Sequence, residues 1–192
     1  MSASIAAAAM GMASFATPAQ AEPVQHMEKD RHCVVNLSDA GAPMACYDTF
    51  TEAVATATGG RIADAPDNAA KALGDARFAA RLNAAGVKKD DTGSTLAASS
   101  PVSIMFDDAD FGGDSLTYTA DHDCTGPTND VDFRVHLVQA NWNDRFGSYK
   151  AFRNCFLSLF EDLDWTGASI GFAGTRTDLG ILDDETSSIR WS

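Results

Sequence analysis

A pattern of eight residues that occurs twice in the second half of the chain sets the strongest limit on its fold. Residues 106–113 (FDDADFGG) and 160–167 (FEDLDWTG) each contain an aromatic residue, a second aromatic five positions later and a glycine at the eighth position. After each copy, apolar and small polar residues alternate, which is typical of a strand with one buried face. The repeat therefore predicts two similar β-hairpins, in which the glycine adopts a backbone conformation that a side chain would disfavour.

A second shared element follows each hairpin. Residues 143–148 (NDRFGS) and 183–188 (DDETSS) both begin with two Asp or Asn residues and end in serine. Gly147 stands in the first copy where Ser187 stands in the second. The first copy also lies further from its hairpin, because 38 residues separate Phe106 from Asp144 and only 24 separate Phe160 from Asp184. We therefore expect an enlarged loop within residues 119–141.

Together these two elements resemble the βγ-crystallin family, in which a Y/F-x-x-x-x-F/W-x-G hairpin is followed by N/D-N/D-x-x-S/T-S. The resemblance covers residues 101–192. It implies a mainly β fold, a βγ-crystallin-like double Greek-key β-sandwich made of two such units. The likeness is to the microbial members, so it implies a bacterial protein, and it implies no enzymatic activity.

In microbial members of the family the Asx-rich loops bind calcium through hard oxygen ligands that the two units share crosswise. Carried over to this sequence, the resemblance implies carbonyl ligands from Arg145 and Glu185 and a hydroxyl ligand from Ser187. The full implied set of metal-binding residues is Asp107, Asp144, Arg145, Glu161, Asp184, Glu185 and Ser187. The alternative is that the same residues only form Asx and Ser turns that organise the fold.

Gly147 breaks the symmetry of the two implied calcium sites, because it offers no side-chain oxygen. We therefore expect one tighter and one weaker site. A serine at position 147 should strengthen the weaker site if the backbone there is not left-handed.

The charge of the chain limits its partners. The net charge is −13, and residues 101–192 carry 16 acidic and only 6 basic side chains. Nucleic acid is excluded as a partner because phosphate backbones require Lys/Arg-rich faces, and an anionic membrane is disfavoured for the same reason. A surplus of carboxylates suits a hard cation such as calcium. We predict a monomer with calcium as its ligand.

The N-terminal residues indicate export. Residues 1–21 carry no charged side chain and end in Ala19-Gln20-Ala21, a small-x-small cleavage pattern, although the usual basic segment is missing. We predict a signal peptide over residues 1–21 and a secreted protein. An exported chain with four cysteines is expected to form disulfides. Three pairings are possible, and the most economical joins Cys33 to Cys46 and Cys124 to Cys155.

Residues 22–85 predict a small α+β module. A hairpin is expected over residues 32–48, a helix over 49–58 and an amphipathic helix over 67–85. Residues 86–100 are almost entirely polar or small and predict a linker. We therefore expect residues 101–192 to fold as a separate domain.

The sequence also contains one enzyme motif and is compatible with one other function. Gly167–Gly171 matches the G-x-S-x-G nucleophile elbow, but no histidine follows His136 to serve as the base. Adjacent carboxylates such as Asp183-Asp184 are expected to be solvated rather than catalytic. The alternative function is a secreted protease inhibitor, or a killer-toxin-like protein, on the same fold. Its 119–141 insertion would then be the loop that enters a protease cleft.

Overall fold

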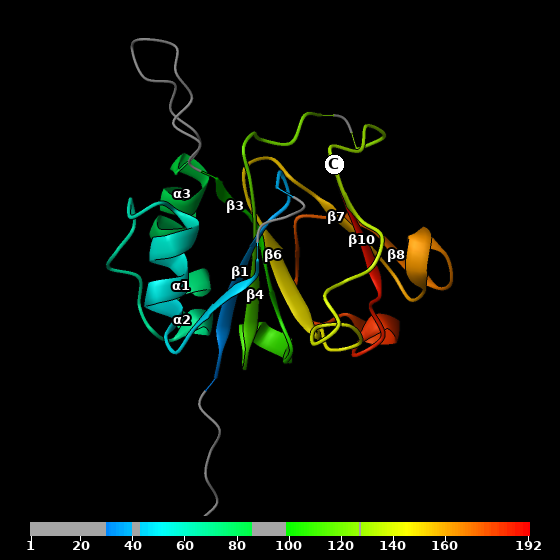
Figure 1. The fold of residues 1–192 in the computed structure, drawn as a ribbon, viewed down its shortest axis with the longest axis horizontal. Coiled ribbons are helices and arrows are strands. Elements are labelled where there is room, and N and C mark those ends of the chain that lie inside the picture. The colour runs from blue at the N-terminus through cyan, green and yellow to red at the C-terminus, as the bar shows by residue number, and fades with distance from the viewer. Residues whose placement is uncertain (1–29, 40–42, 86–98, 127) are drawn as a thin grey trace, which may run out of the picture.

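The computed structural model describes residues 30–39, 43–85, 99–126 and 128–192. The predicted signal peptide and most of the predicted linker lie outside these residues. The described strands form two sheets, with the orders β2-β1-β4-β3-β6-β9 and β5-β10-β7-β8 (Figure 1). In sheet order, the first contains Ala45–Tyr47 (β2), His32–Asn36 (β1), Ser115–Ala120 (β4), Ser100–Phe106 (β3), Ser148–Ala151 (β6) and Thr175–Arg176 (β9). The second contains Phe133–Val135 (β5), Ser188–Trp191 (β10), Leu157–Phe160 (β7) and Ser169–Ala173 (β8).

Helical segments connect or cover these strands. The α-helices are Phe50–Ala57 (α1), Ala69–Gly74 (α2) and Ala76–Ala84 (α3). The 3-10 turns are Ala109–Phe111 (η1), Leu163–Trp165 (η2) and Gly180–Leu182 (η3). No helix in the described part of the chain has the length and apolar character that a bilayer crossing requires.

Strands β3–β6 form one Greek key and strands β7–β10 form the other. Each key places its third strand in the opposite sheet: β5 pairs with β10, and β9 pairs with β6. The two keys are therefore interlocked rather than side by side. This is the predicted βγ-crystallin-like double Greek-key β-sandwich, which is confirmed.

A core rich in aromatic side chains holds the two sheets together. Tyr118, Trp142, Tyr149 and Trp191 are at most 1% exposed. The Trp191 indole nitrogen donates to Ser103 Oγ at 3.0 Å, so its polar atom is satisfied inside the core. Burial of each large apolar side chain contributes roughly 1.5–3 kcal/mol. The alternation that follows the first hairpin in the sequence places Tyr118 on the inner face of β4.

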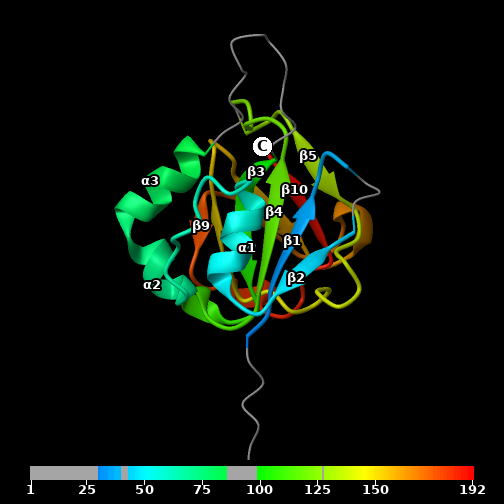
Figure 2. The same cartoon turned by 60° about the vertical axis from the view of Figure 1, so that its left-hand side comes forward.

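The N-terminal hairpin extends the first sheet. Strands β1 and β2 are antiparallel and are joined by the predicted Cys33–Cys46 disulfide. Strand β1 then runs parallel to β4, in register from His32 opposite Ser115 to Asn36 opposite Thr119 (Figure 2). The second predicted disulfide, Cys124–Cys155, is also formed. Two disulfides are compatible with an extracellular location.

The three helices cover the outer face of the first sheet (Figures 1 and 2). Phe50 and Phe78 pack in one buried cluster with Ile104, Phe106 and Phe152 of the β region. The segments on either side of the predicted linker thus share one sheet and one core. The domain boundaries themselves stay a prediction.

The helices differ from the prediction in one place. The helix expected over residues 67–85 is two helices that meet at Asp75, whose side chain accepts a hydrogen bond from Arg77 N at 2.7 Å. Asp75 therefore acts as the N-cap of α3 and ends α2. The helix expected over residues 49–58 is confirmed, with Thr49 as its N-cap.

Candidate metal centre

The two repeated hairpins have the same backbone. Asp110 and Phe111 have φ of 54° and 65°, and their counterparts Asp164 and Trp165 have 54° and 63°. Gly113 and Gly167 follow at 69° and 75°. Left-handed backbone is uncommon for residues with a side chain. The sequence repeat thus corresponds to one turn geometry that occurs twice and requires left-handed backbone at residues with side chains.

A serine at the end of each loop fastens the hairpin to the sheet. Ser148 Oγ donates to Asp108 O at 2.6 Å and accepts from Phe111 N at 3.0 Å. Ser188 Oγ makes the same two bonds, to Asp162 O at 2.6 Å and from Trp165 N at 3.0 Å. This last serine is present in both copies of the sequence element, and its bonds to the hairpin give it a role in organising the fold.

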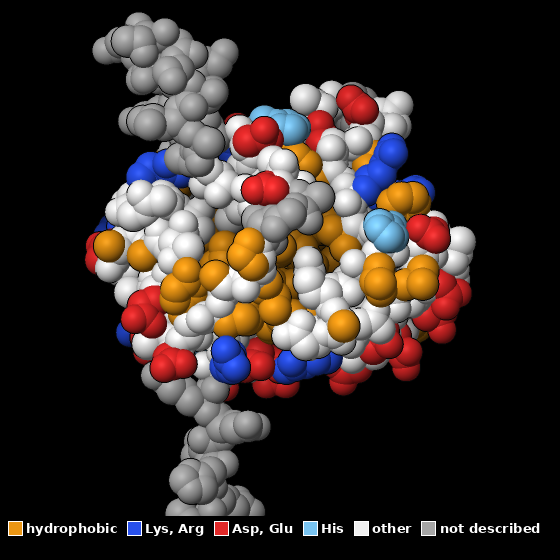
Figure 3. Space-filling model, in the orientation of Figure 1, with side chains coloured by type: hydrophobic (Ala, Val, Ile, Leu, Met, Phe, Trp, Pro, Cys, Tyr) orange, Lys and Arg blue, Asp and Glu red, His pale blue; other side chains and the backbone are white. Residues whose placement is uncertain are grey.

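The two loops pair crosswise at one end of the sandwich. Asp144 N donates to Thr186 O at 3.2 Å, and Asp184 N donates to Phe146 O at 3.1 Å. Acidic side chains are prominent along the lower edge of the molecule in Figure 3. The pairing creates two half-sites. The Ser187 half-site comprises Glu161, Asp144 and Ser187, and the Gly147 half-site comprises Asp107, Asp184 and Gly147.

The Ser187 half-site brings oxygen atoms from both keys together. Ser187 Oγ donates to Asp144 Oδ1 at 3.2 Å, although these residues belong to different loops. Neighbouring oxygens around one calcium ion lie roughly 3 Å apart, since each is about 2.4 Å from the ion. Glu161 extends from the adjacent hairpin, with Oε2 accepting from Ala168 N at 3.0 Å. All three side chains offer oxygen atoms, the donor type that calcium prefers.

The Gly147 half-site is arranged differently. Arg145 Nη2 donates to Asp107 Oδ2 at 2.8 Å and to Asp114 Oδ2 at 3.0 Å. The guanidinium also lies 5.0 Å from the centre of the Trp142 ring. The Asp107 carboxylate is therefore already compensated by a cationic side chain, which lies next to the hairpin backbone carbonyl that the resemblance implies as the metal ligand. This half-site suits a calcium ion less well than the Ser187 half-site does.

The pKa of the Asp107 carboxyl group is raised by burial and by neighbouring charge. Burial, followed by the neighbouring Asp114 carboxylate, raises the pKa of Asp107 to about 6, and Arg145 opposes the rise. Asp183 also has a raised pKa, through burial and the carboxylates of Asp184 and Asp178. In the repeat Arg145 is matched by Glu185. That charge reversal was the sequence signal for the different Gly147 half-site.

The seven expected metal-binding residues are thus distributed unequally. The structure brings Asp144 and Ser187 together and directs the Arg145 side chain to Asp107. Among the described residues, no three His, Cys, Asp or Glu side chains form a ready-made metal site. A calcium ion would therefore depend on hydroxyl and carbonyl oxygens as well. The ligand roles, and the absence of enzymatic activity, stay predictions.

The sequence matches no family model and no curated protein. The structure is similar to solved βγ-crystallin domains. A double mutant of such a domain from Clostridium beijerinckii is 20% identical, and the match covers 47% of this chain and 94% of that one with a TM-score of 0.36. A domain from Flavobacterium johnsoniae is 21% identical, with 47% and 93% covered and a TM-score of 0.35. A domain of Abundant Perithecial Protein from Neurospora crassa, in the calcium-bound form, is 18% identical, with 47% and 88% covered and a TM-score of 0.36.

These identities and scores are low, so the fold assignment rests on the molecule itself. Three features carry it: the strand order within each sheet, the exchange of third strands between the keys, and the twice-occurring hairpin geometry. Residues 100–192 have the βγ-crystallin double Greek-key fold.

Proposed function

We propose that this chain is a secreted calcium-binding protein in which one calcium ion, held at the Ser187 half-site, stabilises the β-sandwich. The observation that carries the proposal is the 3.2 Å approach of Ser187 Oγ to Asp144 Oδ1 across two loops. An ion bound there would link the first key to the second. Its role is structural, because calcium would strengthen the contact between the keys and perform no chemistry.

The charge around the half-site supports the proposal. Asp144 and Glu161 are exposed carboxylates, and no arginine or lysine lies within ion-pair distance of either one among the described residues. Both adopt positions that calcium can reach from solvent. We expect a dissociation constant of about 10⁻⁵ to 10⁻³ M, in the range of sensors and extracellular modules.

Calcium titration of the mature chain by calorimetry tests this function. We expect a stoichiometry of one. At a calcium concentration 100 times the dissociation constant, binding to the folded state alone adds about 2.7 kcal/mol to the free energy of unfolding. For a chain of this size that raises the melting temperature by roughly 5–11 °C.

Two variants localise the site. Asp144→Asn should abolish most of the calcium-dependent shift in melting temperature, and Ser187→Ala should reduce it. The matched control is Asp184→Asn, which removes the equivalent charge from the Gly147 half-site and should leave the shift almost unchanged. No shift in the wild-type protein at millimolar calcium would show that the loops only form structural turns. If Asp144→Asn and Asp184→Asn lost the calcium-dependent shift equally, the ion would not be held at the Ser187 half-site alone.

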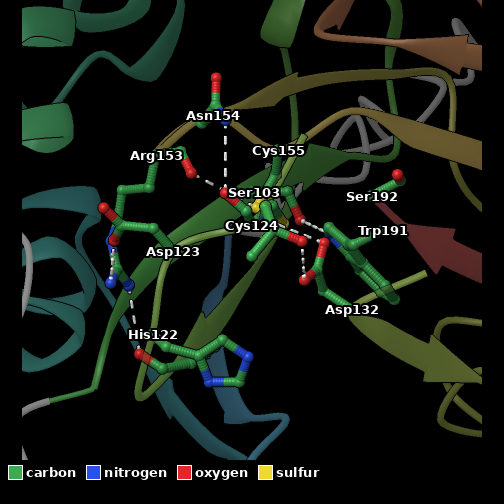
Figure 4. The surroundings of a disulfide bond; sticks show 12 residues. Ser103, His122, Asp123, Cys124, Asp132, Arg153, Asn154, Cys155, Trp191 and Ser192 are labelled. Carbon is green, nitrogen blue, oxygen red and sulfur yellow. Dashed lines mark hydrogen bonds and ion pairs between the residues drawn. A yellow bond between two sulfur atoms is a disulfide. The ribbon is translucent and has the colours of Figure 1, made fainter. Parts of the chain in front are cut away.

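A braced loop favours a second candidate, a secreted protease inhibitor. Residues 121–132 connect β4 to β5, and the Cys124–Cys155 disulfide fixes the base of this loop (Figure 4). The guanidinium of Arg153, which is 3% exposed, forms an ion pair with Asp123 and donates to Ser100 O and Ala120 O at 3.2 Å each. A loop whose base is fixed before binding loses less entropy on entering a cleft.

Inhibition assays against secreted metalloproteases test this second candidate. Inhibition by the wild-type chain that is lost in the Cys124→Ser/Cys155→Ser variant would support it. An absence of inhibition across a panel of such proteases, with the disulfide intact, would count against it. The result is independent of calcium binding, because the loop and the Ser187 half-site share no residue.

A further inference from the structure

Two arginines lie side by side on the outer face of the second sheet. Arg134 of β5 is directly opposite Arg190 of β10. Their guanidinium carbons lie 5.8 and 4.7 Å from the centre of the same Trp165 ring, and that of Arg190 lies 5.3 Å from the Phe160 ring. Like charges directly opposite each other destabilise a sheet. Stacking on the aromatic rings offsets part of that repulsion.

In the part of the chain that the structure describes, neither guanidinium has a carboxylate partner. Among the described residues, the ion pairs of arginine involve Arg81, Arg145 and Arg153, and none reaches Arg134 or Arg190. The chain has 27 acidic residues, so carboxylates are plentiful. Arg190 Nε is also buried without a hydrogen-bond partner. The pair is therefore a local positive site on a strongly acidic protein.

The outer face of the first sheet has a different arrangement of basic side chains. Lys150 is the counterpart of Arg190, and its Nζ donates to Leu73 O at the end of α2 at 2.7 Å. Lys150 lies opposite Thr175 in the sheet, so no second cation lies opposite it on β9. The first face thus has one cation, satisfied by the helices, whereas the second face has two.

The two faces also differ in polarity. Ile104 and Phe152 are buried beneath the helices of the first face. In the repeat their counterparts on the second face are Ser158 and Ser192. No α-helix of the described residues covers the second face in Figures 1 and 2, and the 3-10 turn η2, which carries Trp165, lies against β10. Both serines are buried, and their hydroxyls donate to Ile170 O and Asp130 O. The second face thus lacks the apolar side chains that hold the helices on the first face, which suits a polar ligand better than a packed protein partner.

We propose that this outer face binds an acidic polysaccharide, with the carboxylate of a uronic acid held by Arg134 and Arg190. Two planar guanidinium groups are well suited to a carboxylate. Next to them, Arg190 lies opposite Ser158 on β7, and beyond it Gly171 of β8 is exposed with open space above its Cα. A sugar chain can therefore lie across the strands. Extended peptides instead add to a sheet edge, and helical peptides need an apolar groove.

Binding of tetragalacturonate, with neutral maltotetraose as the comparison, tests the proposal on the mature chain. The titration uses EDTA, so its outcome does not depend on calcium or on the Ser187 half-site. We expect saturable quenching of Trp165 fluorescence and an affinity for tetragalacturonate at least about 10-fold higher than for maltotetraose. Arg134→Gln and Arg190→Gln should each weaken binding roughly 3- to 10-fold.

The matched control is Arg77→Gln on α3, which makes the same charge change at an exposed position on the far side of the molecule. It should leave binding unchanged, and circular dichroism should show that all variants are folded. Equal weakening by the control would mean nonspecific attraction and would overturn the proposal. So would an absence of saturable binding to tetragalacturonate, or tighter binding of a glutamate-rich peptide that depends on the same arginines.

Discussion

Gly147→Ser is the most informative single change, because it restores the hydroxyl that the first key lacks. The sequence predicts a stronger calcium site, provided that the backbone at Gly147 is not left-handed. That condition is met, since Gly147 is not among the residues with positive φ. However, a Cβ at this position would lie 2.7 Å from Asp107 O and 2.8 Å from Asp108 C. We therefore expect destabilisation instead of a gain in affinity.

The size of the effect follows from these distances. Both contacts are with the backbone of the first hairpin, which cannot rotate away as a side-chain end can. An ordinary contact of a Cβ begins at 3.4 Å, so the hairpin would have to move by roughly 0.7 Å. Overpacking of this kind costs about 1–3 kcal/mol. The melting temperature should then fall by roughly 2–12 °C.

Thermal unfolding followed by circular dichroism, in EDTA and in calcium, measures this. Gly147→Ala adds only the Cβ and should reproduce most of the loss, which separates the steric effect from the effect of the hydroxyl. Ser187→Gly removes the hydroxyl without a clash, so it should reduce the calcium-dependent shift and lower the melting temperature in EDTA only modestly, through the lost bond to Asp144 and the added backbone freedom. If Gly147→Ser were as stable as the wild-type protein and bound a second calcium ion, the steric reasoning would be wrong.

Three other predictions concern the ion pair, the disulfide and the N-terminal module. Because the pKa of Asp107 is raised to about 6 in the folded state, the native protein binds more protons than the unfolded chain between about pH 4 and pH 6. Acidification through that range should therefore stabilise the wild-type protein by about 1–2 kcal/mol relative to Asp107→Asn, as measured by urea unfolding. Cys124→Ser/Cys155→Ser opens a loop with a sequence separation of 31 and should lower the free energy of unfolding by roughly 2–4 kcal/mol; an unchanged urea midpoint would contradict this. Residues 99–192 expressed alone should bind the dye ANS and aggregate, because Ile104, Phe106 and Phe152 lose their helical cover; a monomeric, dye-silent fragment would show that the β region is independent.

Local repeats predicted the parts of the fold that depend on local geometry. The matching positions of Phe106 and Phe160 predicted two similar hairpins. In the structure, both hairpins have left-handed backbone at matching positions. The pairing of β1 with β4 could not be predicted, because it joins residues 83 positions apart that share no pattern. The Arg145–Asp107 ion pair could not be predicted from the sequence either. A motif describes which backbone is formed, whereas the direction of one long side chain depends on its neighbours in space.

The parallel pairing of β1 with β4 also dictates an order of events during folding. Closing a loop as long as the separation between His32 and Ser115 costs roughly 4 kcal/mol of chain entropy. The hairpin of β1 and β2 can form by itself, and its cysteines are separated by only 13 positions. Its docking, however, must wait until β4 has been synthesised. The N-terminal segment is thus the first part of the described chain to be made, yet its partner strand comes much later, and we expect its docking to be a late step that stopped-flow refolding can detect.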